Sequence, residues 1–118
     1  MTVRRLKTYT GSQGYVYQYY FVGRRPAVRR EGPATEYIFD VTSDRKTTYA
    51  VSVFLPQQVV ADWNQAHNRC LSDSERYAAA KLRLFRAFDE LQGMQARGRH
   101  SQIDLSFLEE SLAGLGVE

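Results

Sequence analysis

The feature that most constrains the fold of this chain is a two-residue alternation of apolar side chains in residues 34–43 and 47–55. Successive side chains of a β-strand point to opposite faces, so this alternation predicts two strands that each bury one face. A one-residue slip between them would turn one apolar set toward solvent. The predicted register therefore pairs Val41 with Tyr49, Phe39 with Val51 and Tyr37 with Val53 across an odd-length loop of three or five residues.

The opposite face of this hairpin is much more polar. Its positions are Glu36, Ile38, Asp40, Ala50, Ser52 and Phe54. We therefore expect the sheet to be covered on one face only. The second face, through Ile38, Phe54 and Tyr20, is a candidate surface for homodimerisation, and so is an unpaired edge strand.

Two earlier strands are predicted, over residues 4–10 and 15–22, with a turn between them. The second strand is rich in aromatic residues. Its odd positions form the larger apolar face, which we place in the core, with Gln18 on the exposed side. That face consists of Tyr15, Tyr17, Tyr19 and Phe21. Residues 23–33 contain Gly and Pro at both ends and are predicted to form a loop.

Three helices are predicted in the second half of the chain. The first begins with Pro56 at its first helical position and has an apolar face formed by Val59, Val60, Trp63 and His67. The second begins at Ser72, which forms a capping box with Glu75, and continues to Leu91. The last repeats this signal with Ser106 and Glu109.

Strands followed by helices predict an α+β fold. We expect an antiparallel sheet of about four strands, followed by two long helices and a short C-terminal helix, all packed on one sheet face. Residues 1–92 form the predicted domain core, 93–102 a polar linker, and 103–118 the C-terminal helix and tail. The single cysteine, and the lack of a signal peptide or an apolar run of about 20 residues, predict a cytoplasmic chain that is not a membrane protein.

The net charge of +3 conceals an uneven distribution of charge. Residues 1–30 contain seven basic side chains and no acid, whereas residues 101–118 contain four acids and no base. This asymmetry is typical of a nucleic-acid-binding surface. It also arises when a basic start contacts an acidic end, within one molecule or between two, and we favour that interpretation.

Few residues form a pattern that indicates chemistry. Lys81 interrupts the apolar face of the second predicted helix. It either binds an anion with a perturbed pKa, or packs its stem on aromatic rings and pairs with Asp40 or Glu36. His67 and Cys70 lack further metal ligands, so we predict no metal and no cofactor, a helix-end position for His67 and a buried Cys70.

The sequence thus favours a small non-catalytic interaction domain that binds a protein partner or itself, with residues 23–33 as the recognition element. The alternative is single-stranded nucleic-acid binding, with bases stacked on tyrosines and arginines gripping the backbone. A third hypothesis is an enzyme or small-ligand binder that uses Lys81. The candidate binding residues are Arg24, Arg25, Arg29, Arg30, Tyr15, Tyr17, Tyr19 and Lys81.

Overall fold

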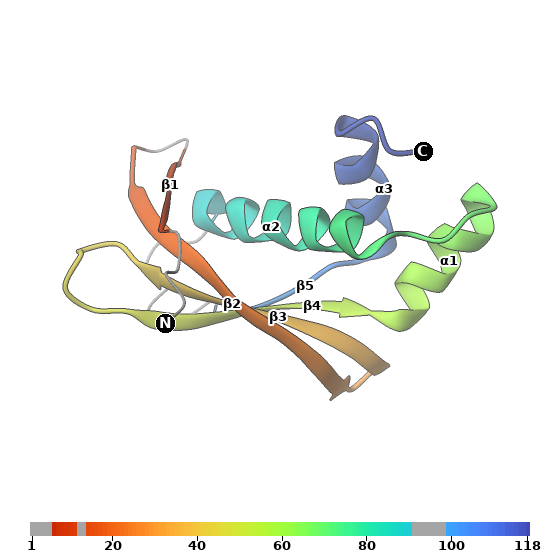
Figure 1. The fold of residues 1–118 in the computed structure, drawn as a ribbon, viewed down its shortest axis with the longest axis horizontal. Coiled ribbons are helices and arrows are strands. Elements are labelled where there is room, and N and C mark those ends of the chain that lie inside the picture. The colour runs from red at the N-terminus through yellow and green to blue at the C-terminus, as the bar shows by residue number, and fades with distance from the viewer. Residues whose placement is uncertain (1–5, 12–13, 91–98) are drawn as a thin grey trace.

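Five strands and three helices make up the computed structural model, which describes residues 6–11, 14–90 and 99–118. The chain forms most of the sheet first and the helices afterwards (Figure 1). In order, the elements are β1 (Lys7–Thr10), β2 (Val16–Arg29), β3 (Gly32–Thr42), β4 (Tyr49–Pro56), α1 (Gln57–His67), α2 (Asp73–Glu90), β5 (His100–Gln102) and α3 (Leu105–Gly114).

The strands form one mixed sheet in the order β1-β2-β3-β4-β5. The strands β1 to β4 pair with one another in antiparallel fashion, while β5 runs parallel to β4. The predicted α+β class is confirmed, with five strands in place of four. The additional strand, His100–Gln102, lies within the predicted polar linker, and the remainder of that linker up to residue 98 is outside the described residues.

The predicted register of the β3–β4 hairpin is confirmed. Val41 pairs with Tyr49, Phe39 with Val51 and Tyr37 with Val53, so both apolar sets face the same side. The connection between the last paired positions consists of residues 42–48. Its length is odd, as predicted, but exceeds the predicted three or five residues. Asp44 stabilises this connection by accepting hydrogen bonds from the backbone N–H groups of Lys46 and Thr47, both at 2.8 Å.

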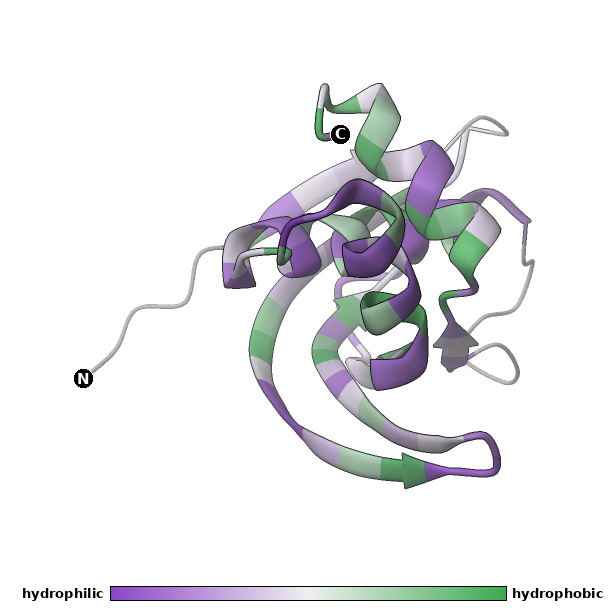
Figure 2. Cartoon of the chain, turned by 90° about the vertical axis from the view of Figure 1, so that its right-hand side faces the viewer, coloured by the Kyte–Doolittle hydropathy of each residue, from purple (hydrophilic) through white to green (hydrophobic). Residues whose placement is uncertain are grey.

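The prediction of a loop over residues 23–33 is wrong. These residues extend β2 and β3 into a long hairpin that closes at Arg30 and Glu31, followed by Gly32 at φ 123°. Pro26 is tolerated because β1 pairs only with residues 16–19, which leaves Pro26 beyond that pairing and at the edge of the sheet. We call residues 23–36 the arm; its strands curve toward a hydrophilic turn (Figure 2).

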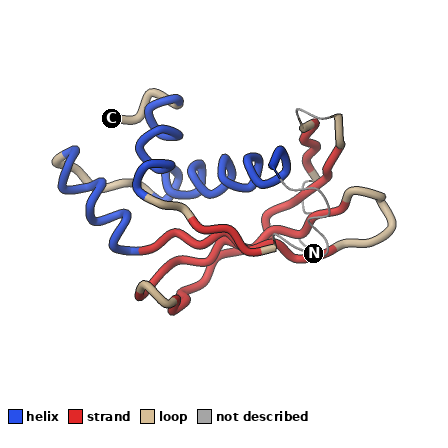
Figure 3. The backbone as a smooth tube through the Cα atoms, turned by 180° about the vertical axis from the view of Figure 1, so that it is seen from behind, coloured by secondary structure: helices blue, strands red, loops and turns tan. Residues whose placement is uncertain are grey.

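The three helices lie on one side of the sheet, as Figure 3 shows from behind. The core between them is rich in aromatic rings. Tyr17 stacks on Phe88 of α2 with ring centroids 4.3 Å apart, and Tyr19 meets Phe85 edge-on at 5.5 Å. The prediction that this face of β2 is buried is confirmed for Tyr17 and Tyr19, but Tyr15 precedes the strand and is 53% exposed.

The helix boundaries agree in part with the predicted capping signals. Ser72 and Glu75 form the expected capping box, with reciprocal hydrogen bonds of 3.1 and 2.9 Å to backbone N–H groups. At α3 the predicted cap, Ser106, is wrong, because Asp104 accepts the hydrogen bond from the Phe107 N–H at 2.8 Å. Pro56 is the N-cap of α1 and not its first helical residue.

The C-terminal helix belongs to the same hydrophobic core as the sheet. Leu108 and Leu112 of α3 are fully buried in one cluster with Trp63 of α1 and Leu84 of α2. Ile103, directly after β5, is also buried in this cluster, and its N–H donates to the Phe54 carbonyl at 2.9 Å. Among the described residues, no helix is long and apolar enough to cross a membrane.

Candidate interaction surface

We call the sheet face opposite the helices the open face (Figure 3). The register of β3 against β4 places on it the polar positions that the alternation predicted. Ile38 is half-buried on this face, and Val16, which alternates with the buried Tyr17, is 44% exposed. Tyr20 donates a 2.6 Å hydrogen bond to Asp40 across β2 and β3. The open face therefore combines exposed aliphatic groups with polar pairs.

A β-bulge in β2 distributes the arm arginines over the two faces of the sheet. The register shifts between Phe21 and Gly23, so even-numbered residues after the bulge take the side that odd-numbered residues held before it. Arg24 is thereby on the helix side, opposite Tyr37, whereas Arg25 is on the open face, opposite Glu36. A second open-face position of the arm is Arg29.

The centre of the open face is a buried carboxylate. Glu36, only 8% exposed, accepts hydrogen bonds from Arg25 Nε at 2.8 Å and from Ser52 Oγ at 2.6 Å. Burial alone would raise the pKa of Glu36, but the hydrogen bonds from Arg25 and Ser52 outweigh it, and the pKa lies below the ordinary value. This carboxylate is therefore ionised at neutral pH and holds Arg25 in place.

Beside this network, an arginine and a histidine cover an aromatic ring. The Arg29 guanidinium lies 3.8 Å from the centroid of the Phe54 ring, and the His100 ring meets Phe54 edge-on at 5.6 Å. A guanidinium stacked on one side retains its second flat side and its N–H donors for another molecule. Arginine and aromatic residues grouped in this way are common at the centres of protein interfaces.

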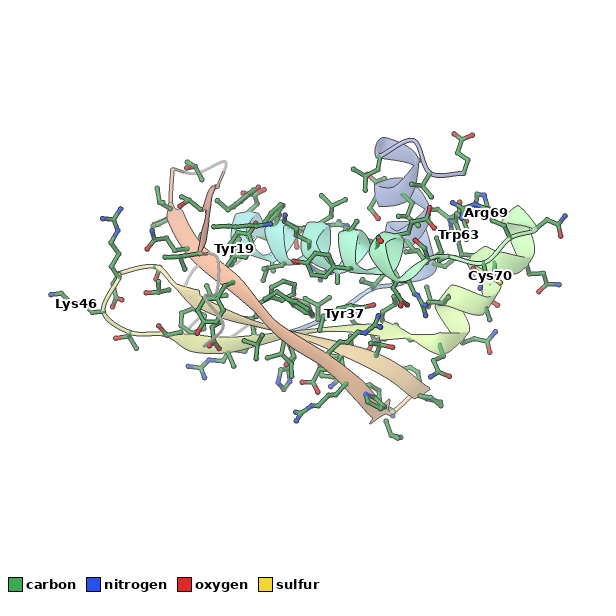
Figure 4. All side chains as sticks on the ribbon, in the orientation of Figure 1. Tyr19, Tyr37, Lys46, Trp63, Arg69 and Cys70 are labelled. Atoms are coloured by element: carbon green, nitrogen blue, oxygen red, sulfur yellow. The ribbon has the colours of Figure 1, made fainter. Side chains whose placement is uncertain are left out.

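The predicted binding tyrosines do not converge with the arginines. Tyr17 and Tyr19 are buried beneath α2, as Figure 4 shows for Tyr19, and burial raises the pKa of Tyr19 to about 12. Tyr15 is exposed, but it lies before the start of β2, whereas Arg30 follows the far end of this 14-residue strand. Arg30 itself is exposed at the tip of the arm.

Lys81 lies on the helix side and does not pair with either predicted carboxylate. Glu36 is bonded to Arg25 and Ser52, and Asp40 to Tyr20, all on the open face. The Lys81 ammonium lies 5.9 Å from the centroid of the Phe85 ring, which agrees with a stem packed on aromatic side chains. Burial, followed by the neighbouring Lys7, lowers the pKa of Lys81. Its use by an enzyme or a small-ligand site remains a prediction.

The remaining candidates are at the end of α1. His67 is the last residue of that helix, as predicted; it stacks on Trp63 at 4.0 Å and contacts Glu109 of α3 at 2.8 Å. The prediction of a buried Cys70 is wrong, because its side chain is exposed (Figure 4). The next residue, Leu71, is the one that is buried in the core. Within the described ranges, no group of three or more His, Cys, Asp or Glu residues is placed to hold a metal ion.

Two arginines from the basic first 30 residues form ion pairs, one with α2 and one with β3. Arg24 pairs with Asp73 and Arg25 with Glu36, while Glu109 in the acidic end pairs with His67. The predicted meeting of basic start and acidic end is thus not made by these arginines within one molecule. No protein-family model, no curated protein and no solved structure matches this chain.

Two parts of this surface were absent from the sequence-based candidates. The Glu36–Ser52 hydrogen bond was not anticipated. The register of β3 against β4 places the two residues as diagonal neighbours on one face of the sheet. His100 was assigned to a linker. Its position opposite Ser52 depends on β5, whose three residues are too few to produce an alternation.

Proposed function

We propose that this chain is a small, non-catalytic interaction domain that forms a homodimer through its open face. The observation that carries the proposal is that α1, α2 and α3 all pack on the other side of the sheet (Figure 1). An antiparallel sheet with aliphatic and aromatic side chains on its second face gains from packing that face on another layer. The stacked Arg29–Phe54 pair supplies the kind of anchor that such interfaces use.

A second copy of the chain fits this face because the face contains opposite charges at its two ends. Arg25 and Arg29 lie toward the arm, and Asp40 lies toward the other end of β3. Arg25 is 66% exposed despite its bond to Glu36, so several of its N–H donors face outward. A two-fold axis that lies between the two stacked sheets, parallel to their planes and perpendicular to the strands, would place the arginines of each copy over Asp40 of the other.

The alternative, single-stranded nucleic-acid binding, is supported by the arm arginines only. Base stacking requires exposed rings beside the basic groups. The rings of Tyr17 and Tyr19 are buried, and Tyr15 is far from the arm. We therefore rank this function second.

Sedimentation velocity over a range of protein concentrations tests the dimer. We expect the sedimenting mass to rise from that of the 13.6 kDa chain to twice that value, with a dissociation constant of about 1–100 μM. Fluorescence anisotropy of labelled single-stranded DNA and RNA tests the alternative, which predicts binding that weakens steeply with salt. A chain that stays monomeric up to millimolar concentration and binds oligonucleotides would overturn the proposal.

A further inference from the structure

A polar cleft lies beside the arm, where Arg24 points to the helix side of the sheet. Its volume is about 300 Å³, and it is formed where the arm and β3 approach the starts of α1 and α2. The residues that matter are Arg24, Thr35, Tyr37, Gln57, Asp73 and Arg76. Of all the residues that line the cleft, only Pro26 lacks a hydrogen-bonding side chain, which distinguishes this cleft from a simple gap in apolar packing.

The β-bulge brings the first of the two arginines into this cleft. Without the register shift between Phe21 and Gly23, residue 24 would point to the open face together with Gln18 and Tyr20. With the shift, Arg24 lies opposite Tyr37 and reaches the first turn of α2. The bulge therefore has a chemical consequence besides its effect on strand twist.

Two guanidinium groups converge on one carboxylate in the cleft. Arg24 Nη2 lies 3.2 Å from Asp73 Oδ2, and Arg76 Nη2 lies 2.6 Å from Asp73 Oδ1. The Arg24 guanidinium, with help from Arg76, holds the pKa of Asp73 below its ordinary value. Each guanidinium has five N–H donors and gives only one nitrogen to Asp73, so both retain capacity for a further anion.

The Asp73 carboxylate is not locked in this position. Its side chain is 64% exposed, so it can rotate into water when a competing anion enters. With Asp73 in place, the three groups sum to one positive charge, and with Asp73 turned outward the arginines present two. Two adjacent positive charges match a dianion, and forked guanidinium donors suit the oxygens of a phosphate.

Neutral donors complete the cleft. Tyr37 is almost fully buried, and burial raises its pKa, while a hydrogen bond from Arg24 acts in the opposite direction. The phenol is therefore neutral at pH 7 and retains its O–H as a donor. The Gln57 amide and the Thr35 hydroxyl provide two more groups that hydrogen bond without adding charge.

We propose that this cleft binds a small ligand bearing a phosphate monoester, with Arg24 and Arg76 gripping the phosphate and Asp73 displaced toward solvent. The volume is at the lower limit of known ligand pockets, which favours a compact molecule over a dinucleotide. The proposal does not rest on the homodimer, because Arg24, Asp73 and Arg76 are on the helix side of the sheet, and Arg25, which borders the cleft, is bonded to Glu36 on the open face.

The test is isothermal titration calorimetry in a phosphate-free buffer, with inorganic phosphate and ribose 5-phosphate as separate probes. We expect saturable binding, weakened about 10-fold or more by Arg24→Gln and by Arg76→Gln. Asp73→Asn should strengthen binding about 3- to 10-fold, because it removes the competing carboxylate. Arg30→Gln, an exposed arginine at the arm turn, is the matched control and should change the affinity less than about 2-fold.

Three results would overturn the proposal. One is the absence of saturable binding when either probe is titrated to a concentration of about 20 mM, because a dissociation constant above that value is too weak for a specific site. Another is equal weakening by Arg30→Gln and Arg24→Gln, which indicates nonspecific attraction. The third is stronger competition by a single-stranded oligonucleotide at equal phosphate concentration, which would assign the arginines to a diester backbone. If an arginine variant folds poorly, the Asp73→Asn variant still tests the proposal, because it is expected to bind the probes more tightly than the unmodified chain.

Discussion

A variant with Val16→Lys and Ile38→Lys is expected to sediment as a monomer at concentrations where the unmodified chain is a dimer. Both positions are on the open face, Val16 toward the start of β2 and Ile38 in the middle of β3. Stacking two copies would bury four ammonium groups without carboxylate partners, and each costs several kcal/mol when it leaves water. We therefore expect the dissociation constant to rise by about 100-fold or more, as measured by sedimentation velocity.

The matched control for this variant is Val28→Lys. Val28 is 86% exposed near the tip of the arm, so the same change of an aliphatic residue to lysine is made outside the open face. This control should fold and dimerise like the unmodified chain. If Val28→Lys dissociates the dimer while the open-face variant does not, the arm tip is the interface and the open face is not.

Replacing Glu36 with glutamine is expected to destabilise the monomer by about 1–3 kcal/mol at pH 7, because charge-assisted hydrogen bonds from Arg25 and Ser52 are lost at a buried site. The folded-state pKa of Glu36 is lower than its unfolded-state value near 4.5. Its contribution to stability is thus complete above pH 4.5 and is lost as the pH falls through the lowered pKa.

Urea unfolding at a series of pH values measures this effect. The difference in unfolding free energy between the unmodified chain and Glu36→Gln should be largest at neutral pH and should narrow in acid. Glu31→Gln, at the exposed turn of the arm, is the control and should differ from the unmodified chain by less than about 0.5 kcal/mol at any pH. A difference for Glu36→Gln that stays constant from pH 7 to strong acid would contradict the assigned ionisation.

The parts of the fold that follow from local patterns were predictable from the sequence. Alternation alone set the register of β3 against β4, because a one-residue slip would turn the apolar set of one of the two strands toward solvent. The Ser72–Glu75 capping box located the start of α2, since it satisfies helix N–H groups by residues close in sequence. Such features need no information from distant residues.

The arm and β5 depend on distant partners and were missed for that reason. Gly23 and Pro26 are turn-forming residues by their own preferences, and only pairing with β3 makes them part of a strand. The strand β5 has three residues and depends on β4 for its hydrogen bonds. The same limit applied at Cys70. Whether Cys70 or Leu71 is buried depends on the core residues that surround this position, and those residues are distant in the sequence.

The candidate surface was predictable in outline and not in detail. The polar second face of the hairpin and the basic residues of the arm were both identified from the sequence. The assignment of Arg24 and Arg25 to opposite faces was not, because it depends on a bulge that no local pattern marks. Aromatic residues on one strand face were compatible with either a core or a binding surface, and α2 decides between them by covering Tyr17 and Tyr19.

The most direct test of the open-face homodimer is a series of ¹H–¹⁵N correlation NMR spectra recorded from low micromolar to millimolar protein. The homodimer predicts concentration-dependent shifts confined to residues of the open face, with Val16, Arg25, Ile38 and Ala50 among the largest. Shifts that instead cluster on α2 and α3, or spectra that do not change with concentration, would contradict it.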